Sequence, residues 1–234
     1  MRIAGLARSS TVDFPGLISA VIFSPGCNFD CFFCHNRTLL DGEQTLLDNS
    51  EILAFLERRR HLLDGVVFSG GEPTLQPDLA AMIGEVRRLG YRIKLDTNGA
   101  RPQVLRDLLA AGALDYVAID FKAPWPRYAD ICGCGPDDVE AVRASFALLA
   151  EHEVWPGLDW EVRTTVIPQL GEQELNEMAH SLPPAPHYFL QRYNKPAAHR
   201  AADRFRLEAP ALTPARLVLL AEALRVCQPN IQIR

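Results

Sequence analysis

Short apolar runs alternate with longer amphipathic stretches along the chain. Six of the runs have the β-branched and aromatic composition of buried strands, and they span residues 18–23, 65–69, 91–95, 116–119, 160–166 and 188–191. A segment with apolar residues at helical spacing follows each of them, at about 51–57, 77–89, 102–111, 136–150, 172–182 and 214–226. The pattern therefore predicts six strand-then-helix units.

Polar motifs follow at least four of the predicted strands. They are the cysteine-rich loop 27–34, Gly70-Gly71-Glu72-Pro73, Asp96-Thr97-Asn98-Gly99 and Asp120-Phe121-Lys122. Parallel α/β barrels place their active-site residues at the C-terminal ends of the strands, so these motifs predict one shared site. Six units rather than eight favour a partial (β/α)6 barrel with an open side, built as a single domain over residues 1–234.

The segments at the edges of these units give weaker signals. Pro15 and Gly16 predict a turn before the first strand, and residues 1–17 are assigned no strand. Asn49 or Ser50 is the expected N-cap of the first helix. Arginines 58–60 suit the dipole at the C-terminal end of that helix, and a solvated helix end is favoured over a phosphate site.

Two pairs of charged residues fall on predicted strands. The alternation in 160–166 sends Glu161, Arg163 and Thr165 to one face and the residues between them to the other. If the first face is the barrel interior, Arg163 is a buried cation that needs an anion, and Glu161 is the structural candidate. Asp120 and Lys122 also share a face, where they can pair with each other or with a charged ligand.

The composition excludes some partners. The chain has a net charge of −5, a pI near 5.7 and scattered basic residues, so no nucleic-acid partner is expected. It has no apolar run of membrane-spanning length and no signal-peptide pattern, which predicts a cytoplasmic protein without a membrane partner. In that reducing compartment, clustered cysteines indicate metal binding or catalysis rather than disulfides.

Three of the six cysteines lie within eight positions. Cys27, Cys31 and Cys34 are spaced C-x3-C-x2-C directly after a predicted strand. Three thiolates are one short of the four that hold a [4Fe–4S] cluster entirely by protein, so one iron would stay open to another ligand. A zinc site would need a fourth ligand, and His35 is the alternative, although it follows Cys34 too closely to share an ion easily.

The cysteine spacing, with Phe33 as the aromatic residue before the last cysteine, resembles the signature of the radical S-adenosylmethionine enzymes. In that family the open iron is chelated by the amino and carboxylate groups of S-adenosylmethionine. The continuation His35-Asn36 and the upstream segment Asp13-Phe14-Pro15-Gly16 narrow the resemblance to the activases of glycyl-radical enzymes. Among these, the chain is most similar to the activating proteins of anaerobic ribonucleoside-triphosphate reductase.

This resemblance implies a reaction and its partners. Reduction of the cluster by flavodoxin or ferredoxin would cleave S-adenosylmethionine, and the 5′-deoxyadenosyl radical would take hydrogen from a glycine of a partner enzyme. That partner is expected to be anaerobic ribonucleoside-triphosphate reductase. Two other functions stay open: a radical S-adenosylmethionine enzyme that acts on a small molecule, such as a deazapurine synthase, and a non-catalytic iron–sulfur or zinc protein.

The resemblance also assigns roles to the motifs that follow the strands. By themselves these motifs read as turns and surface ion pairs. In the activases, Gly70, Gly71 and Glu72 match the motif that binds the amino group of S-adenosylmethionine. The other implied cofactor-binding residues are Phe33, Asp96, Asn98, Lys122, Arg163 and Gln191. A monovalent cation is implied at Asp96, Thr97 and Asp120, with help from the carbonyl of Ala118.

The remaining cysteines do not suggest a second cluster. Cys132 and Cys134 flank a glycine, and Cys227 lies far away near the C-terminus. No further C-x2-C-x2-C segment accompanies them. A glycine-rich loop with incidental thiols is the favoured interpretation of Cys132 and Cys134.

Overall fold

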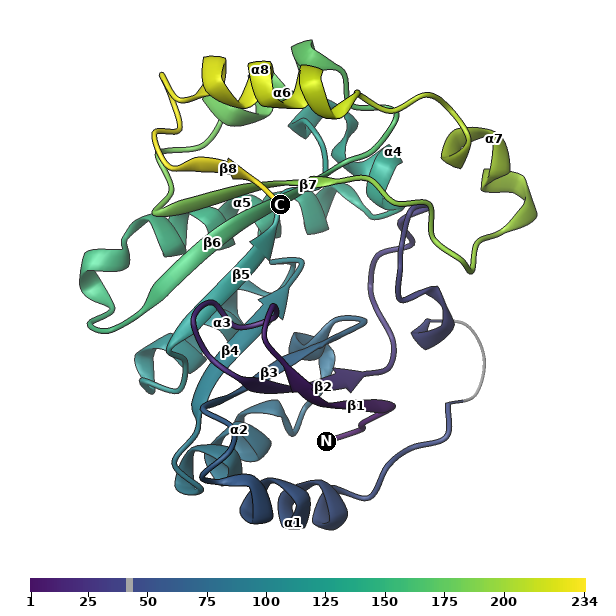
Figure 1. Ribbon diagram of the computed structural model, residues 1–234. Helices are drawn as coiled ribbons and strands as arrows, with labels where there is room; N and C mark the ends of the chain where they lie inside the picture. Colours follow the sequence, from purple (N-terminus) through teal and green to yellow (C-terminus); the bar gives the residue numbers. More distant parts are fainter. Residues whose placement is uncertain (41–43) are drawn as a thin grey trace.

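The described residues form one open, mostly parallel sheet. The computed structural model describes residues 1–40 and 44–234, and among them eight strands follow one another across the sheet in sequence order. The strands are β1 (Gly5–Ser10), β2 (Ser19–Ser24), β3 (Gly65–Gly70), β4 (Arg92–Thr97), β5 (Tyr116–Asp120), β6 (Asp159–Val166), β7 (His187–Arg192) and β8 (Ile231–Ile233). Neighbours from β2 to β8 pair in parallel, and β1 pairs antiparallel with β2 (Figure 1).

Strands β2 to β7 match the six predicted strands, so the partial barrel of strand-then-helix units is confirmed. The flanking strands β1 and β8 were not predicted. The side chains of β1 are half-buried or exposed, so its sequence has no clear alternation of apolar and polar residues. With only three residues, β8 is too short to give a signal.

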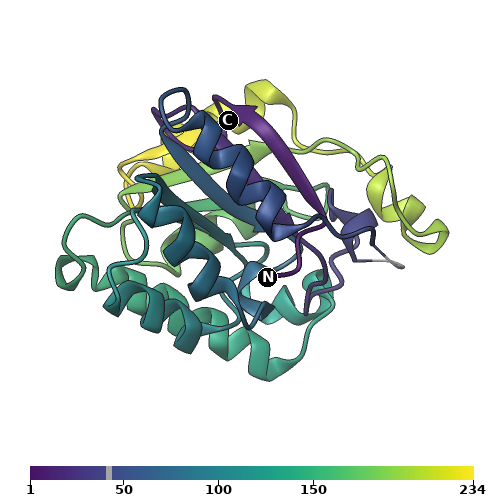
Figure 2. The same cartoon turned by 90° about the horizontal axis from the view of Figure 1, so that it is seen from below.

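The longer helices connect consecutive parallel strands. They are α1 (Asn49–Arg59), α2 (Leu79–Arg88), α3 (Pro102–Ala110), α5 (Pro136–Ala150), α6 (Glu172–His180) and α8 (Pro214–Leu224). Two short helices, α4 (Tyr128–Cys132) and α7 (Arg204–Leu207), lie in connections, as do the 3₁₀ turns Arg37–Leu39, Pro73–Leu75, Trp125–Arg127, His152–Val154 and Ala201–Asp203. Figure 2 shows α1, α2, α3 and α5 packed in series on one face of the sheet. None of the described helices is long and apolar enough to cross a membrane.

The first helix begins one residue earlier than the sequence suggested. Asp48 is the N-cap of α1, and its carboxylate accepts a hydrogen bond of 2.7 Å from the backbone N–H of Ser50. The predicted caps Asn49 and Ser50 are therefore wrong, because both lie inside the first turn. Three adjacent residue types can cap a helix here, and the sequence does not say which one leaves helical geometry.

The two faces of the sheet differ in chemistry. Alternate residues such as Ile22, Leu95 and Val162 face the helices in the main core, where each is fully buried and contributes about 1.5–3 kcal/mol to folding. On the opposite, concave face, Phe14 and Tyr116 are part of a small second apolar cluster on β2, β3 and β5. Farther along β4, β5 and β6, charged side chains take the place of apolar ones on this concave face. An ionic site therefore lies at the C-terminal ends of these strands.

Candidate active site

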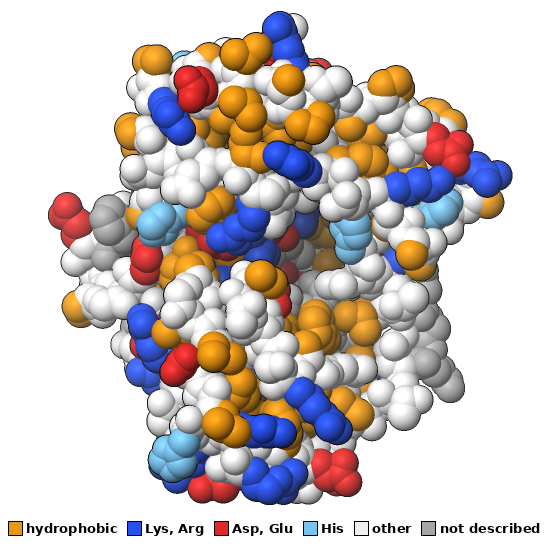
Figure 3. Space-filling model, viewed as in Figure 1, with side chains coloured by type: hydrophobic (Ala, Val, Ile, Leu, Met, Phe, Trp, Pro, Cys, Tyr) orange, Lys and Arg blue, Asp and Glu red, His pale blue; other side chains and the backbone are white. Residues whose placement is uncertain are grey.

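A cavity of about 420 Å³ lies at the C-terminal ends of the central strands. The hollow near the centre of the face in Figure 3 has acidic and basic side chains in its depth. The structure brings the predicted site residues, apart from Ala118, to the wall of this cavity: Cys27, Cys31, Cys34, Phe33, Gly70, Gly71, Glu72, Asp96, Thr97, Asn98, Asp120, Lys122, Arg163 and Gln191. Strand ends far apart in the sequence thus converge on one site.

The cysteine loop follows β2 and is held by hydrogen bonds to its own backbone and to the end of β4. The sulfur of Cys27 accepts from the N–H of Phe29 at 3.4 Å and from the side-chain amide of Asn98 at 3.7 Å. The N–H of Cys34 donates to the carbonyl of Cys31 at 3.1 Å. The hydrogen bond from Phe29 lowers the pKa of Cys27 and so opposes the larger effect of burial.

The glycine motif after β3 lies directly against the cysteine loop. The N–H of Gly71 donates to the carbonyl of Ser24 at 2.9 Å, and the N–H of Glu72 donates to the carbonyl of Gly26 at 2.8 Å. Gly70 has a φ of +120°, where residues with a side chain are strained. A Cβ atom on Gly71 would overlap the carbonyl of Gly26. Both glycines are therefore needed for the close approach of the two loops.

Gly71→Ala is expected to displace the cysteine loop and to lower the iron bound per chain after reconstitution. The backbone shift that the added Cβ atom forces should also lower the free energy of unfolding by about 1–3 kcal/mol. Gly84→Ala is the matched control, because Gly84 lies in helix α2 with no atom within 4 Å of the added Cβ, and it should bind iron normally. Iron analysis and thermal unfolding measure both effects, and normal iron content in Gly71→Ala would contradict this account of the loops.

Glu72 is fully buried and joins the loops after β3 and β4. One carboxylate oxygen accepts from the backbone N–H and the hydroxyl of Thr74 at 3.0 and 2.5 Å and from the hydroxyl of Thr97 at 2.8 Å. The other accepts from the N–H of Asn98 at 2.7 Å. Burial raises the pKa of Glu72, and the hydrogen bonds only partly offset that effect. The structure thus gives this carboxylate a structural task in holding two loops together.

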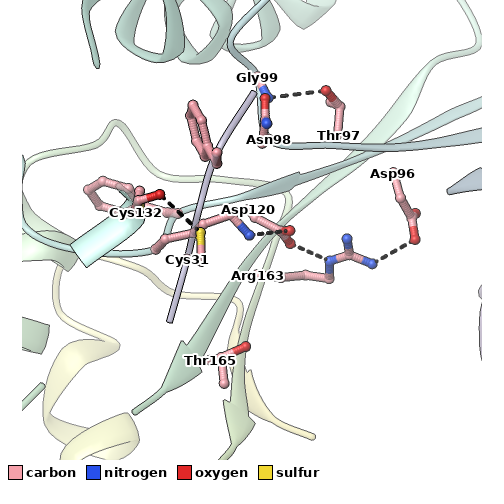
Figure 4. A network of polar contacts seen from close by, with 12 residues as sticks. Cys31, Asp96, Thr97, Asn98, Gly99, Asp120, Cys132, Arg163 and Thr165 are labelled. Carbon is pink, nitrogen blue, oxygen red and sulfur yellow. Dashed lines mark hydrogen bonds and ion pairs between the residues drawn. The ribbon is translucent and has the colours of Figure 1, made fainter. Parts of the chain in front are cut away.

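A chain of ion pairs crosses the concave face. The guanidinium of Arg163 bridges two carboxylates, with Nε 2.9 Å from Oδ1 of Asp120 and Nη1 3.1 Å from Oδ2 of Asp96 (Figure 4). Lys122 contacts the second oxygen of Asp120 at 2.8 Å, and Lys94 contacts the second oxygen of Asp96 at 2.5 Å. Each of the four carboxylate oxygens therefore already faces a cationic side chain.

The structural pairing of Arg163 with Glu161, considered from the residues alone, is not formed, because Arg163 pairs with Asp96 and Asp120. Glu161 lies deeper on the same face, where it accepts a hydrogen bond of 2.9 Å from the hydroxyl of Tyr116. Its cationic neighbours are Lys94 at 4.0 Å and Arg234 at 3.6 Å. Asp96 and Asp120, which lie on other strands, come closer to Arg163 than Glu161, which lies two positions earlier on the same strand. The pairing therefore depends on the sheet register.

The chain matches the radical S-adenosylmethionine superfamily over residues 21–182. It belongs to that superfamily. A curated relative from Methanocaldococcus jannaschii is 31% identical over 199 residues, which cover 84% of this chain and 82% of the relative. The name of that relative describes it as an inferred glycyl-radical enzyme activating enzyme. The resemblance first seen in the cysteine loop is thus confirmed, and the chain is a radical S-adenosylmethionine enzyme.

Other similarities are partial or concern the fold. An inferred GTP 3′,8-cyclase of Saccharolobus solfataricus is 33% identical over 105 residues, which cover 44% of this chain and 34% of that protein. Among solved structures, SuiB of Streptococcus suis bound to S-adenosylmethionine aligns with a TM-score of 0.63 at 13% identity, over 92% of this chain and 51% of SuiB. At that identity the alignment supports the radical S-adenosylmethionine fold and nothing more specific.

The superfamily implies a [4Fe–4S] cluster and S-adenosylmethionine, and the cavity fits both. Three thiols line it, and its volume lies in the range of small-molecule sites. Within residues 1–40 and 44–234, no three His, Cys, Asp or Glu side chains gather around a position for a single metal ion. Three cysteines on one wall are the ligand set that a [4Fe–4S] cluster with one open iron takes from protein.

Burial and nearby charges act in opposite directions on the cavity residues. Burial raises the pKa of Cys27 to about 12 and also raises the pKa of Cys34, while the ammonium of Lys122 opposes both shifts.

Burial likewise tends to raise the pKa of Asp120, but the charges of Arg163 and Lys122 outweigh it and lower the value to about 2. Since the usual value is 3.8, these ion pairs stabilise the fold above about pH 4, and this stability is lost as the pH falls towards 2.

The cavity also contains residues that the sequence reasoning did not assign to it. The hydroxyl of Ser69 donates to Oδ2 of Asp96 at 3.2 Å, and the hydroxyl of Thr165 lies 3.5 Å from Oε1 of Gln191. Asp13, noted only as part of the resemblance, lies on the wall as well. Ser69 stands at the end of a predicted strand, and Thr165 stands two residues beyond Arg163 on the same face of its strand. These positions could have identified both residues from the sequence.

Proposed function

We propose that this radical S-adenosylmethionine enzyme generates a glycyl radical on a partner protein, and that the partner is anaerobic ribonucleoside-triphosphate reductase. The observation that carries the proposal is the 31% identity to the Methanocaldococcus jannaschii relative, which extends over most of both chains. The segments Asp13-Phe14-Pro15-Gly16 and Cys34-His35-Asn36 support the same activity. The GTP 3′,8-cyclase similarity covers less than half of this chain.

The cofactors supply the radical chemistry, namely reductive cleavage of S-adenosylmethionine at a [4Fe–4S] cluster whose electron comes from flavodoxin or ferredoxin. In our proposal, Cys27, Cys31 and Cys34 hold the cluster and leave one iron without a protein ligand. The half-open cavity limits water around the reacting groups and leaves a side through which a macromolecular substrate can enter.

Different parts of the wall would hold S-adenosylmethionine. We propose that Gly70 and Gly71 let the backbone approach its amino group, while Glu72 mainly fixes the position of that backbone. Arg163 and Lys122, which line the cavity, would supply positive charge for its carboxylate. Phe33, Asn98 and Gln191 complete the set of contacts that we expect.

A monovalent cation at Asp96, Thr97 and Asp120 fits this chain poorly. Both carboxylates are bridged by Arg163, and their remaining oxygens contact Lys94 and Lys122. A further cation would have to displace one of these side chains and would be repelled by the others. We therefore propose that the guanidinium of Arg163 supplies the positive charge that the resemblance assigned to an added cation.

The proposed function is tested by looking for the radical itself. The reconstituted enzyme is mixed anaerobically with dithionite, S-adenosylmethionine and a candidate anaerobic ribonucleotide reductase, and the mixture is examined by electron paramagnetic resonance. A glycyl doublet that disappears when the target glycine is replaced by alanine is the expected result. Pyruvate formate-lyase and GTP without any protein partner serve as parallel substrates. A doublet only on pyruvate formate-lyase would change the partner, and turnover of GTP alone would contradict the activase function.

A further inference from the structure

One buried cysteine contacts the cysteine loop through its backbone carbonyl but is not part of the C-x3-C-x2-C motif. Cys132 ends helix α4 and is fully buried, and its carbonyl accepts from the thiol of Cys31 at 3.6 Å and from the N–H of Asp30 at 2.9 Å. The contact with Cys132 lowers the pKa of Cys31, while burial raises the pKa of Cys132 well above its usual value. Figure 4 shows Cys31 directed at Cys132. The structure thus places Cys132 against the cysteine loop, a contact that the sequence did not reveal.

The contact between the two loops is fixed by the backbone. Gly133 has a φ of +59°, and a Cβ atom there would lie 2.9 Å from the carbonyl oxygen of Asp30. The N–H of Cys134 closes the end of α4 by donating to Ala129 at 3.1 Å. The carboxylate of Asp30 also forms an ion pair of 2.5 Å with Arg37. The segment that carries Cys132 therefore stays next to Cys31.

Cys31 differs from the other two motif cysteines in this respect. The sulfur of Cys27 is met by the N–H of Phe29 and the amide of Asn98, neither of which is a thiol. The backbone N–H of Asn36 is the hydrogen-bond partner of the sulfur of Cys34. Among the described hydrogen bonds of the motif cysteines, only that of the Cys31 thiol ends on another cysteine from outside the motif, at the carbonyl of Cys132. Cys31 also lines the cavity, so a small oxidant can reach it.

We propose that Cys132 is a resolving cysteine for Cys31, so that a Cys31–Cys132 disulfide forms when the chain lacks its cluster and meets hydrogen peroxide. The sulfur of Cys31 attacks one peroxide oxygen, the O–O bond breaks, and a sulfenic acid and one water form. The sulfur of Cys132 then attacks the sulfenic sulfur, the S–O bond breaks, and the oxygen leaves as a second water. Overall, two thiols and one peroxide give one disulfide and two waters.

This step would keep the empty site repairable. A sulfenic acid that finds no thiol is oxidised further to sulfinic acid, which thiol reductants do not reverse. A disulfide is returned to two thiols by an ordinary dithiol. Cys132 thus protects the most deeply buried cysteine of the motif during periods without iron.

The test treats the iron-free full-length chain with hydrogen peroxide, blocks the remaining thiols by alkylation, and maps disulfides and sulfinic acids by peptide mass spectrometry. The wild-type chain is expected to give Cys31–Cys132 as the main crosslink and to bind iron again after dithiothreitol. Cys132→Ser is expected to accumulate sulfinic acid at Cys31 and to regain roughly five-fold less iron. Cys227→Ser is the control, because Cys227 hydrogen-bonds locally to Leu224 at 3.2 Å, and it should behave as wild type.

The wild-type map decides the proposal even if Cys132→Ser does not fold. A main crosslink between Cys132 and Cys134, a crosslink within residues 27–34, or sulfinic acid at Cys31 in the wild-type chain would each overturn it. Because the crosslink map and the regain of iron need neither S-adenosylmethionine nor a partner, failure of this test is distinct from failure of the proposed activase function.

Discussion

Cys31→Ala is expected to lose both bound iron and cleavage of S-adenosylmethionine, with cleavage falling to about 1% of wild type or less, because two thiolates hold a [4Fe–4S] cluster poorly. Cys31 is the most buried of the three motif cysteines, so no water-exposed side chain can take its place. Iron analysis, the visible absorption of the reconstituted protein and the yield of 5′-deoxyadenosine measure the effect.

The control for this substitution is Cys227→Ala. Cys227 is half-buried after helix α8 and does not line the cavity, so its loss should leave iron content and cleavage unchanged. Full cleavage by Cys31→Ala would remove the cluster assignment. Loss of iron in Cys227→Ala would show instead that general destabilisation, rather than the loss of a ligand, explains the result.

Arg163→Gln is expected to have the second largest effect, because it leaves Asp96 and Asp120 facing each other without their bridge. Removing one partner from a buried ionic network lowers the free energy of unfolding by about 3–5 kcal/mol. Binding of S-adenosylmethionine should weaken as well, since its carboxylate loses a cation. Arg163→Lys should recover only part of both, because an ammonium cannot bridge two carboxylates with the planar geometry of a guanidinium.

The response to salts separates this account from a cation-dependent site. Wild-type cleavage should not change when K⁺ is replaced by tetramethylammonium at equal ionic strength. Arg163→Gln should regain part of its S-adenosylmethionine affinity in K⁺ or Na⁺, because a small cation can then lie between Asp96 and Asp120. Arg106→Gln is the matched control on the exposed face of α3, with an expected change within about 0.5 kcal/mol. A K⁺ requirement in the wild-type enzyme would contradict our view of Arg163.

Much of this site could be predicted because its residues stand at fixed places in the chain. Parallel strands end at one edge of the sheet, so Cys27, Gly71, Asp96 and Asp120 had to come together once the strands were assigned. The alternation in β6 likewise placed Arg163 on the concave face, and the structure confirms that face.

The features that the sequence did not reveal depend on long-range packing. Arg163 meets Asp96 and Asp120 through the register of three strands, and no local pattern distinguishes these partners from Glu161. The contact of Cys132 with Cys31 spans 101 positions and depends on how the end of α4 meets the cysteine loop. The edge strand β1 went unnoticed because it lacks a buried face.

We propose that three cysteines hold the cluster and leave one of its irons open to S-adenosylmethionine. Electron–nuclear double resonance of the reduced, reconstituted protein tests it most directly, with S-adenosylmethionine labelled by ¹⁵N in its amino group and ¹⁷O in its carboxylate. Couplings from both labels are expected, and they should weaken in Gly71→Ala and be lost in Cys31→Ala. A reduced cluster whose spectrum shows neither coupling at saturating S-adenosylmethionine would contradict it.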